Sequence, residues 1–253
     1  MMRLASLLLL LPLLAFALPS QAQPLLTMPE RCASPDSLHY VDAPLHNLAA
    51  RLKTDEPVRL FVLGTSSSMR EATHGLPRTY IAGLPEALQP LLLGRSLDIV
   101  NLSQRMQSTQ EMRRKIATDI IPARPDLVLW QTGAVEAGRQ TDVNTFGEAL
   151  MDGLQALRAA NIDVVLVGPQ YRPRLSALVD ARAINNYMAL IAERENVPLF
   201  PRYEIMLYWS ENGRFDGSTN NTELQMREAE MQNRCLALGL AQMIQRAVAM
   251  ARK

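Results

Sequence analysis

The sequence is short of the residues that usually build metal centres and strongly charged surfaces. It has three histidines and two cysteines in 253 residues. The cysteines, Cys32 and Cys235, lie near opposite ends of the chain and lack the spacing of metal ligands, so no metal and no cofactor is expected. Basic and acidic residues number 26 and 25 and form no basic stripe, which argues against nucleic acid and anionic membrane surfaces as partners.

Long hydrophobic runs are missing beyond the first residues of the chain. That first segment has a positive Arg3 and then an apolar run over Leu7–Ala17, which is too short to span a bilayer comfortably. Small residues at Ser20 and Ala22 fit a signal-peptide cleavage site, so we expect cleavage after Ala22 and a mature chain that begins at Gln23. The alternative is an uncleaved anchor.

The expected organisation is a signal peptide, residues 1–22, followed by one domain, residues 23–253. Such a leader predicts a periplasmic or secreted protein, and no stable membrane insertion is expected for the mature chain. Exported proteins meet oxidising conditions in which two thiols tend to pair, so we predict a disulfide between Cys32 and Cys235. Two separate free thiols are the alternative.

Short apolar runs alternate with helical patterns along the domain. Runs without period-2 alternation are typical of strands buried on both faces of a parallel sheet. Five such runs occur, at Val58–Leu63, Leu97–Leu102, Asp126–Gln131, Asp163–Val167 and Pro198–Phe200. Helical patterns cover residues 36–51, 80–93, 109–121, 145–160, 176–196 and 228–252. This order predicts an α/β domain in which a parallel sheet carries helices on both faces.

The first strand and the residues that follow it are the most informative segment. The strand ends at Gly64, and Thr65 and a serine cluster that begins at Ser66 come next. Because ligands of such sheets bind at the carboxyl ends of the strands, Ser66 stands where an α/β hydrolase displays its nucleophile. The alternative is that Thr65, Ser66 and Ser67 cap a following helix.

Four segments in order resemble the sequence blocks of the SGNH/GDSL hydrolase family of esterases, lipases and deacetylases. Gly64–Ser68 is similar to Gly-Asp-Ser, Val100–Met106 to the block that ends in an oxyanion glycine, Pro125–Ala137 to Gly-Thr-Asn-Asp, and Thr222–Met226 to Asp-x-x-His. The resemblance covers nearly all of the mature chain. It implies a flavodoxin-like, three-layer α/β/α fold with a parallel five-stranded sheet, and Ser66 at the nucleophile position.

Each block departs from the family at the residue that carries the chemistry. Thr65 replaces the aspartate next to the nucleophile, Met106 the oxyanion glycine, Val135 the oxyanion asparagine, Thr222 the orienting aspartate and Gln225 the histidine. A glutamine does not accept a proton near neutral pH, and a valine does not donate a hydrogen bond to an oxyanion. The resemblance therefore predicts an impaired site in which Ser66 is a relic or a weak nucleophile. Glu136 and Asp216 are possible cleft residues.

A replacement base has few candidates. The histidines are His39, His46 and His74. We expect the first two on or beside an N-terminal arm and His74 at the rim of the cleft. The simpler interpretation of each is a surface or partly buried polar residue.

Three functions follow as hypotheses. The first is an exported protein with an impaired hydrolase site, which binds an acyl or carbohydrate-type small molecule or supports an active exported partner. The second is an active but atypical serine ester hydrolase that uses Ser66. The third is a non-catalytic assembly protein.

Overall fold

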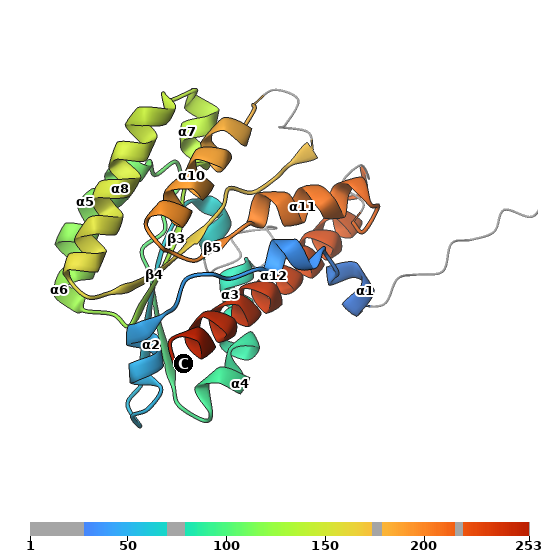
Figure 1. Ribbon diagram of the computed structural model, residues 1–253. Coiled ribbons are helices and arrows are strands. Elements are labelled where there is room, and N and C mark those ends of the chain that lie inside the picture. The colour runs from blue at the N-terminus through green and yellow to red at the C-terminus, as the bar shows by residue number, and fades with distance from the viewer. Residues whose placement is uncertain (1–27, 70–78, 174–178, 216–219, 253) are drawn as a thin grey trace, which may run out of the picture.

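A computed structural model describes residues 28–69, 79–173, 179–215 and 220–252 (Figure 1). Its sheet has five strands, which are β1 (Val58–Leu63), β2 (Leu97–Asn101), β3 (Leu127–Gln131), β4 (Asp163–Val167) and β5 (Leu199–Phe200). Their order is β2-β1-β3-β4-β5, and all neighbours are parallel. The predicted parallel five-stranded sheet is therefore confirmed, with each strand within one residue of its expected bounds at either end.

The register of the strands brings their carboxyl ends to one edge of the sheet. Val62 of β1 pairs with Asn101 of β2, and Leu63 pairs with Trp130 of β3. At the other side of β3, Gln131 pairs with Val167, which in turn pairs with Phe200 of β5. We call this the carboxyl edge; it consists of the strand ends and the residues that directly follow them.

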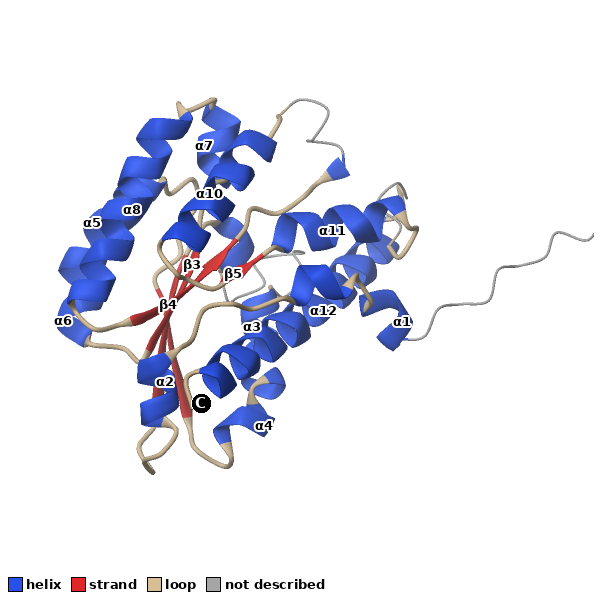
Figure 2. Ribbon diagram, viewed as in Figure 1, coloured by secondary structure: helices blue, strands red, loops and turns tan. Residues whose placement is uncertain are grey.

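Helices cover both faces of the sheet and make three layers (Figure 2). One face is covered by α2 (His46–Arg51), α3 (Tyr80–Ala87), α4 (Gln89–Leu92), α11 (Arg202–Glu211) and α12 (Thr222–Met250). The other face is covered by α5 (Thr109–Lys115), the π turn Ile116–Ile120, α6 (Ile121–Ala123), α7 (Ala134–Arg139), α8 (Val143–Ala159) and α10 (Arg182–Arg194). Along β3, Leu127 and Leu129 enter the first core while Val128 and Trp130 enter the second, as expected for a strand buried on both faces.

Several helix predictions were wrong in extent. The helix expected over residues 36–51 is a 3₁₀ turn, Asp36–His39, and then α2, because Pro44 disfavours helical backbone at the residue before it. The helix expected over residues 80–93 divides at Leu88, next to Pro90 in the first turn of α4. Three helices were not predicted: α1 (Met28–Cys32), α7 and α11.

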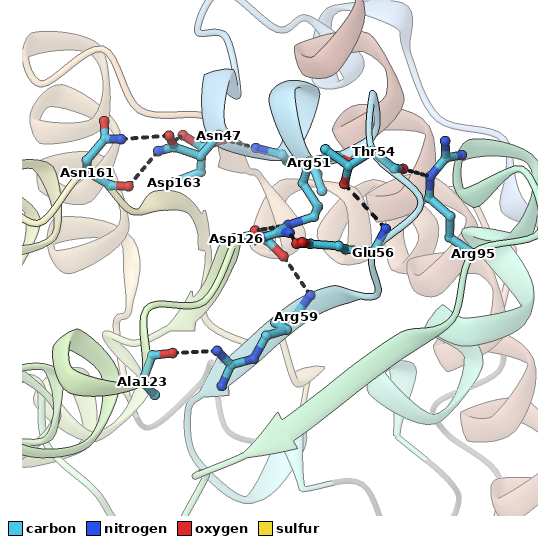
Figure 3. Close-up of polar contacts among 11 residues, drawn as sticks. Asn47, Arg51, Thr54, Glu56, Arg59, Arg95, Ala123, Asp126, Asn161 and Asp163 are labelled. Atoms are coloured by element: carbon cyan, nitrogen blue, oxygen red, sulfur yellow. Dashed lines mark hydrogen bonds and ion pairs between the residues drawn. The ribbon is translucent and has the colours of Figure 1, made fainter.

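Polar contacts at the amino ends of the strands fix α2 there (Figure 3). The carboxylate of Asp163, at the start of β4, accepts a hydrogen bond from Asn47 Nδ2 at 3.1 Å. Asp126, which precedes β3, accepts hydrogen bonds from Arg51 Nε and from the Arg59 backbone, both at 2.8 Å. The start of α2 therefore lies at the edge of the sheet opposite the carboxyl edge.

The predicted disulfide is present and joins the N-terminal arm to the last helix. Cys32 of α1 is bonded to Cys235 of α12, with the two Cα atoms 5.1 Å apart. Arg31 reinforces this junction because its Nη2 atom lies 2.8 and 2.6 Å from the two carboxylate oxygens of Glu228. No helix among the described residues has the length and apolarity needed to cross a membrane.

The disulfide closes a loop over a sequence separation of 203 residues, so its loss is expected to destabilise the protein strongly. In the chain-entropy account, Cys32→Ala combined with Cys235→Ala lowers the free energy of unfolding by about 4–5 kcal/mol. Urea titrations of both proteins, with and without reductant, measure the difference. Reductant should weaken only the parent protein, and a loss of under about 1 kcal/mol would contradict the expected effect.

Candidate functional site

The end of β1 is packed closely against the end of β3. A Cβ atom added to Gly64 would lie 2.8 Å from Ser68 Oγ and 3.1 Å from Gln131 Oε1, so only glycine fits at this position without displacing its neighbours. The following residues, Ser66–Ser68, form the 3₁₀ turn η2. The predicted strand, glycine and serine cluster are thus at the carboxyl edge, but the serines form a single turn rather than the start of a long helix.

The side chain of Gln131 holds this turn in place through hydrogen bonds. Its side chain is fully buried at the end of β3. The Oε1 atom accepts hydrogen bonds from the Thr65 backbone N–H at 3.0 Å, the Thr65 hydroxyl at 2.9 Å and the Ser68 hydroxyl at 3.2 Å. Thr65 makes no side-chain capping bond. The alternative in which the Thr65 side chain caps a helix is therefore not what the structure shows, because its hydroxyl donates to Gln131 Oε1 instead.

Ser66 is the exposed member of the cluster. Its hydroxyl makes no hydrogen bond to any of the described residues, and no histidine among them approaches it. His46 begins α2 at the opposite edge of the sheet. His39 bonds to Ser34 Oγ at 2.8 Å and, through its carbonyl, to Arg246 near the end of α12. His74 lies outside the described residues, so the described site presents a serine without a base.

Ser67 and Ser68 belong to a polar network that contains a buried arginine, Arg202, which the sequence analysis did not predict. Arg202, the first residue of α11, is 1% exposed, and its Nη1 atom donates to Ser67 Oγ at 2.9 Å. Its guanidinium carbon lies 4.8 Å from the centroid of the Tyr80 ring, whose hydroxyl is 2.8 Å from Ser68 Oγ. Burial lowers the pKa of Arg202 to about 10 and raises the pKa of Tyr80. One connected polar network therefore joins the ends of β1, β3 and β5.

The second block lies where the resemblance placed it. The Gln104 backbone N–H donates to the Gly64 carbonyl at 3.0 Å, which holds this loop beside the end of β1. Met106 has a φ of 56°, in the left-handed region that glycine adopts without penalty, and its side chain is 62% exposed. The backbone at Met106 thus suits the family glycine although a methionine occupies it.

The third block has become part of the core. Val135 is 6% exposed in the first turn of α7 and offers no side-chain donor. Glu136 is buried, and its Oε1 atom accepts the Thr109 backbone N–H at 2.6 Å, at the start of α5. Glu136 therefore connects α7 to α5, and its other oxygen has no partner among the described residues.

The last block was expected in a loop before the final helix, and that expectation was wrong. Thr222 and Gln225 belong to the first turn of α12, because the Asn221 side chain caps the Leu224 N–H and starts the helix earlier than predicted. Within the described residues, neither side chain forms a hydrogen bond with Ser66. Asp216 lies outside the described residues.

Unsatisfied polar groups gather at the carboxyl edge. Within the described part of the chain, seven buried side-chain atoms lack a hydrogen-bond partner, and six of them belong to residues at or beside this edge: Ser103, Gln131, Glu136, Asn185, Arg202 and Glu204. Asn185 packs closely against Gly168, which follows β4. A Cβ atom on that glycine would lie 3.2 Å from Asn185 Oδ1. Buried polar groups are usually paired, so this clustering makes the edge the candidate functional side of the sheet.

Two cavities are lined by residues outside the four blocks, although Phe200 at the end of β5 lines the second of them. One of about 390 Å³ opens at the amino ends of the strands and is lined by His46 and Asp163 among others. The other, of about 400 Å³, lies between the N-terminal arm and α12 and is lined by Cys32 and Trp209 among others. Neither is lined by a residue of the four blocks. In the described ranges, no three or more His, Cys, Asp or Glu side chains are grouped to hold a metal ion.

A sequence profile of the non-GDSL lipase-like family matches residues 31–250. The chain belongs to this family. Comparison with curated protein sequences gives no significant match. The family assignment and the three-layer fold confirm the expected relationship to SGNH/GDSL hydrolases.

Solved structures share the fold of this family member at low sequence identity. The acetyl xylan esterase AlAXEase is 18% identical, with a TM-score of 0.57 over 72% of this chain and 98% of that one. A lipase/acylhydrolase from Enterococcus faecalis is 14% identical, with a TM-score of 0.58 over 73% and 93%. A putative lipolytic protein of the G-D-S-L family from Desulfitobacterium hafniense is 15% identical, with a TM-score of 0.50 over 70% and 99%.

Gln131→Leu is expected to destabilise the protein because it removes the acceptor of the buried Thr65 N–H and hydroxyl and one of the two bonds of the Ser68 hydroxyl. The loss in the free energy of unfolding should be about 2–4 kcal/mol. Gln110→Leu on α5, where the side chain is exposed, is the matched control and should change stability little. Urea titration compares the two variants. Equal stabilities would show that the Gln131 network does not hold the end of β1.

Proposed function

We propose that the protein is an exported member of the SGNH/GDSL fold class whose hydrolase site is catalytically impaired and whose carboxyl edge binds an acyl or carbohydrate-type ligand. The observation that carries the proposal is the exposed Ser66 hydroxyl, which has no base among the described residues. The neighbouring polar groups form hydrogen bonds to other residues. Thr65 and Ser68 are bonded to Gln131, and Glu136 is bonded to the start of α5.

The chemistry supports slow hydrolysis at best. A serine hydroxyl attacks an ester efficiently only when a base removes its proton. Loss of a single oxyanion donor costs a factor of about 10²–10³ in rate, and Val135 supplies no such donor. The rate losses from a missing base and from a missing oxyanion donor do not simply add. Either loss alone is enough to make hydrolysis slow.

Ligand binding is supported by what remains at the edge. The fold keeps the position at which α/β sheets bind their ligands, and the same edge holds most of the buried polar atoms that lack a partner among the described residues. Support of an active exported partner is the other use that this arrangement allows. The leader with its site after Ala22, and a disulfide that needs an oxidising compartment, support export.

Fluorophosphonate labelling tests the impaired site and the leader together. The full chain is expressed in a bacterial host, purified from the periplasmic fraction and weighed intact before and after treatment. We expect a mass that begins at Gln23 and no adduct, while an active SGNH esterase treated in parallel is labelled. A mass that retains residues 1–22 would reject cleavage.

Variants of two neighbouring serines and of one histidine show which residue carries any label and whether a histidine activates it. Any adduct is tested in Ser66→Ala, in Ser67→Ala as the matched control, and in His74→Ala. A single adduct that disappears only in Ser66→Ala and His74→Ala would contradict the impaired site and identify an active, atypical hydrolase. A non-catalytic assembly protein would give no adduct and a stable complex with another exported protein.

A further inference from the structure

Arg202 is a buried cation without a counter-charge. Its guanidinium group is 1% exposed, donates one hydrogen bond to Ser67 Oγ and lies over the Tyr80 ring. Its Nε atom has no partner, and no carboxylate among the described residues forms a hydrogen bond or ion pair with it. Glu204, two residues along the chain, bonds to Asn185 through one carboxylate oxygen, and its other oxygen makes no hydrogen bond within the described residues. A buried charge is normally paired, so this arrangement is incomplete.

The surroundings of Arg202 add positive charge. Its pKa of about 10 leaves the guanidinium charged at neutral pH, and Arg172, an exposed residue in the segment after β4, acts on it with a charge of the same sign. The backbone of Arg202 begins α11, which carries no side-chain cap, so the positive end of that helix has no side-chain acceptor at its N-cap. Burial and a like charge both disfavour the cation, and an anion would relieve both.

A second donor without a partner lies next to Arg202. The Gln131 Nε2 group is buried and makes no hydrogen bond within the described residues. Ser67 connects the two side chains: its half-buried Oγ atom accepts a hydrogen bond from Arg202 Nη1 at 2.9 Å and donates one to Gln131 Oε1 at 3.4 Å. Exposed Ser66 is the next residue toward solvent. Two residues with an unpaired buried donor, Gln131 and Arg202, are therefore joined through the serine that follows exposed Ser66.

We propose that the ligand of the carboxyl edge carries a carboxylate or a phosphate, which binds beside Ser66 and Ser67 and neutralises Arg202. The proposal rests on the proposed function, because it specifies the chemical class of the ligand of that same edge. The anion joins or replaces Ser67 Oγ as the acceptor of the guanidinium, and Gln131 Nε2 supplies a further hydrogen bond.

Pairs of probes that differ only in charge test the anion. Calorimetric titration compares hexanoate with hexanamide, glucuronate with glucose, and inorganic phosphate with sodium chloride at equal ionic strength. We expect at least one anion to bind at least tenfold more tightly than its neutral or salt counterpart. Preference for hexanoate identifies an acyl carboxylate, for glucuronate an acidic sugar, and for phosphate a phosphorylated ligand. No preference in any pair would overturn the proposal.

Arg202→Met separates binding from folding. Because it replaces an unpaired buried charge by an apolar chain, it should not lower the melting temperature and should remove the preference for the anion. A purely structural role predicts a lower melting temperature and unchanged anion binding, which would overturn the proposal. If this variant does not fold, Arg172→Gln should weaken anion binding several-fold, while Arg182→Gln, an exposed arginine paired with Asp180, should not. Equal binding by both would also overturn it.

The outcome is distinguishable from that of the labelling experiment. Anion binding together with a Ser66 adduct would reject the impaired site and keep the anion subsite. No adduct and no anion preference would keep the impaired site and reject the subsite.

Discussion

A single acceptor, the side-chain oxygen of Gln131, holds the functional edge of this protein in place. It collects hydrogen bonds from the backbone and hydroxyl of Thr65 and from the hydroxyl of Ser68, all in a buried environment where an unmade bond is costly. The contact requires Gly64, since any side chain there would collide with Ser68 and approach Gln131 Oε1. The turn that displays Ser66 is therefore fixed by neutral hydrogen bonds between two adjacent strand ends.

This arrangement exchanges the charged groups of a hydrolase for neutral ones, with one exception. Threonine, glutamine and serine occupy the centre of the network, and Glu136 is fixed against the start of α5. Arg202 brings a formal charge into the centre, and no carboxylate in the described part of the chain pairs with it. Its bond to Ser67 and its contact with the Tyr80 ring offset only part of the cost of burying this charge, whereas a ligand that completes the pair would gain affinity.

Much of the fold could be predicted from the sequence, because its cause is local. Apolar runs such as Val58–Leu63 specify buried strands directly, and their order specifies a parallel sheet. The disulfide followed from the expected compartment and the number of cysteines. The helix boundaries were less accessible, since Pro44 and the cap at Asn221 move them by several residues. The site was predicted to the level of Ser66 at a strand end.

The network itself could not be predicted in this way. Gln131 and Thr65 are 66 residues apart, and only the register of β1 against β3 brings them together. Arg202 gave one signal, a charged residue two positions after the last apolar strand, and the carboxyl-edge rule applied to β5 would have found it. Its burial and its missing partner depend on the packing of Tyr80 and Ser67, which no sequence pattern reports.

The most direct test of the central claim is the steady-state hydrolysis of p-nitrophenyl acetate by the purified mature protein and by Ser66→Ala. If the end of β1 is a neutral, fixed turn that does not activate its serine, both proteins hydrolyse the ester at rates within about twofold of each other. A rate at least tenfold lower in Ser66→Ala would show that Ser66 is an activated nucleophile and would contradict the account.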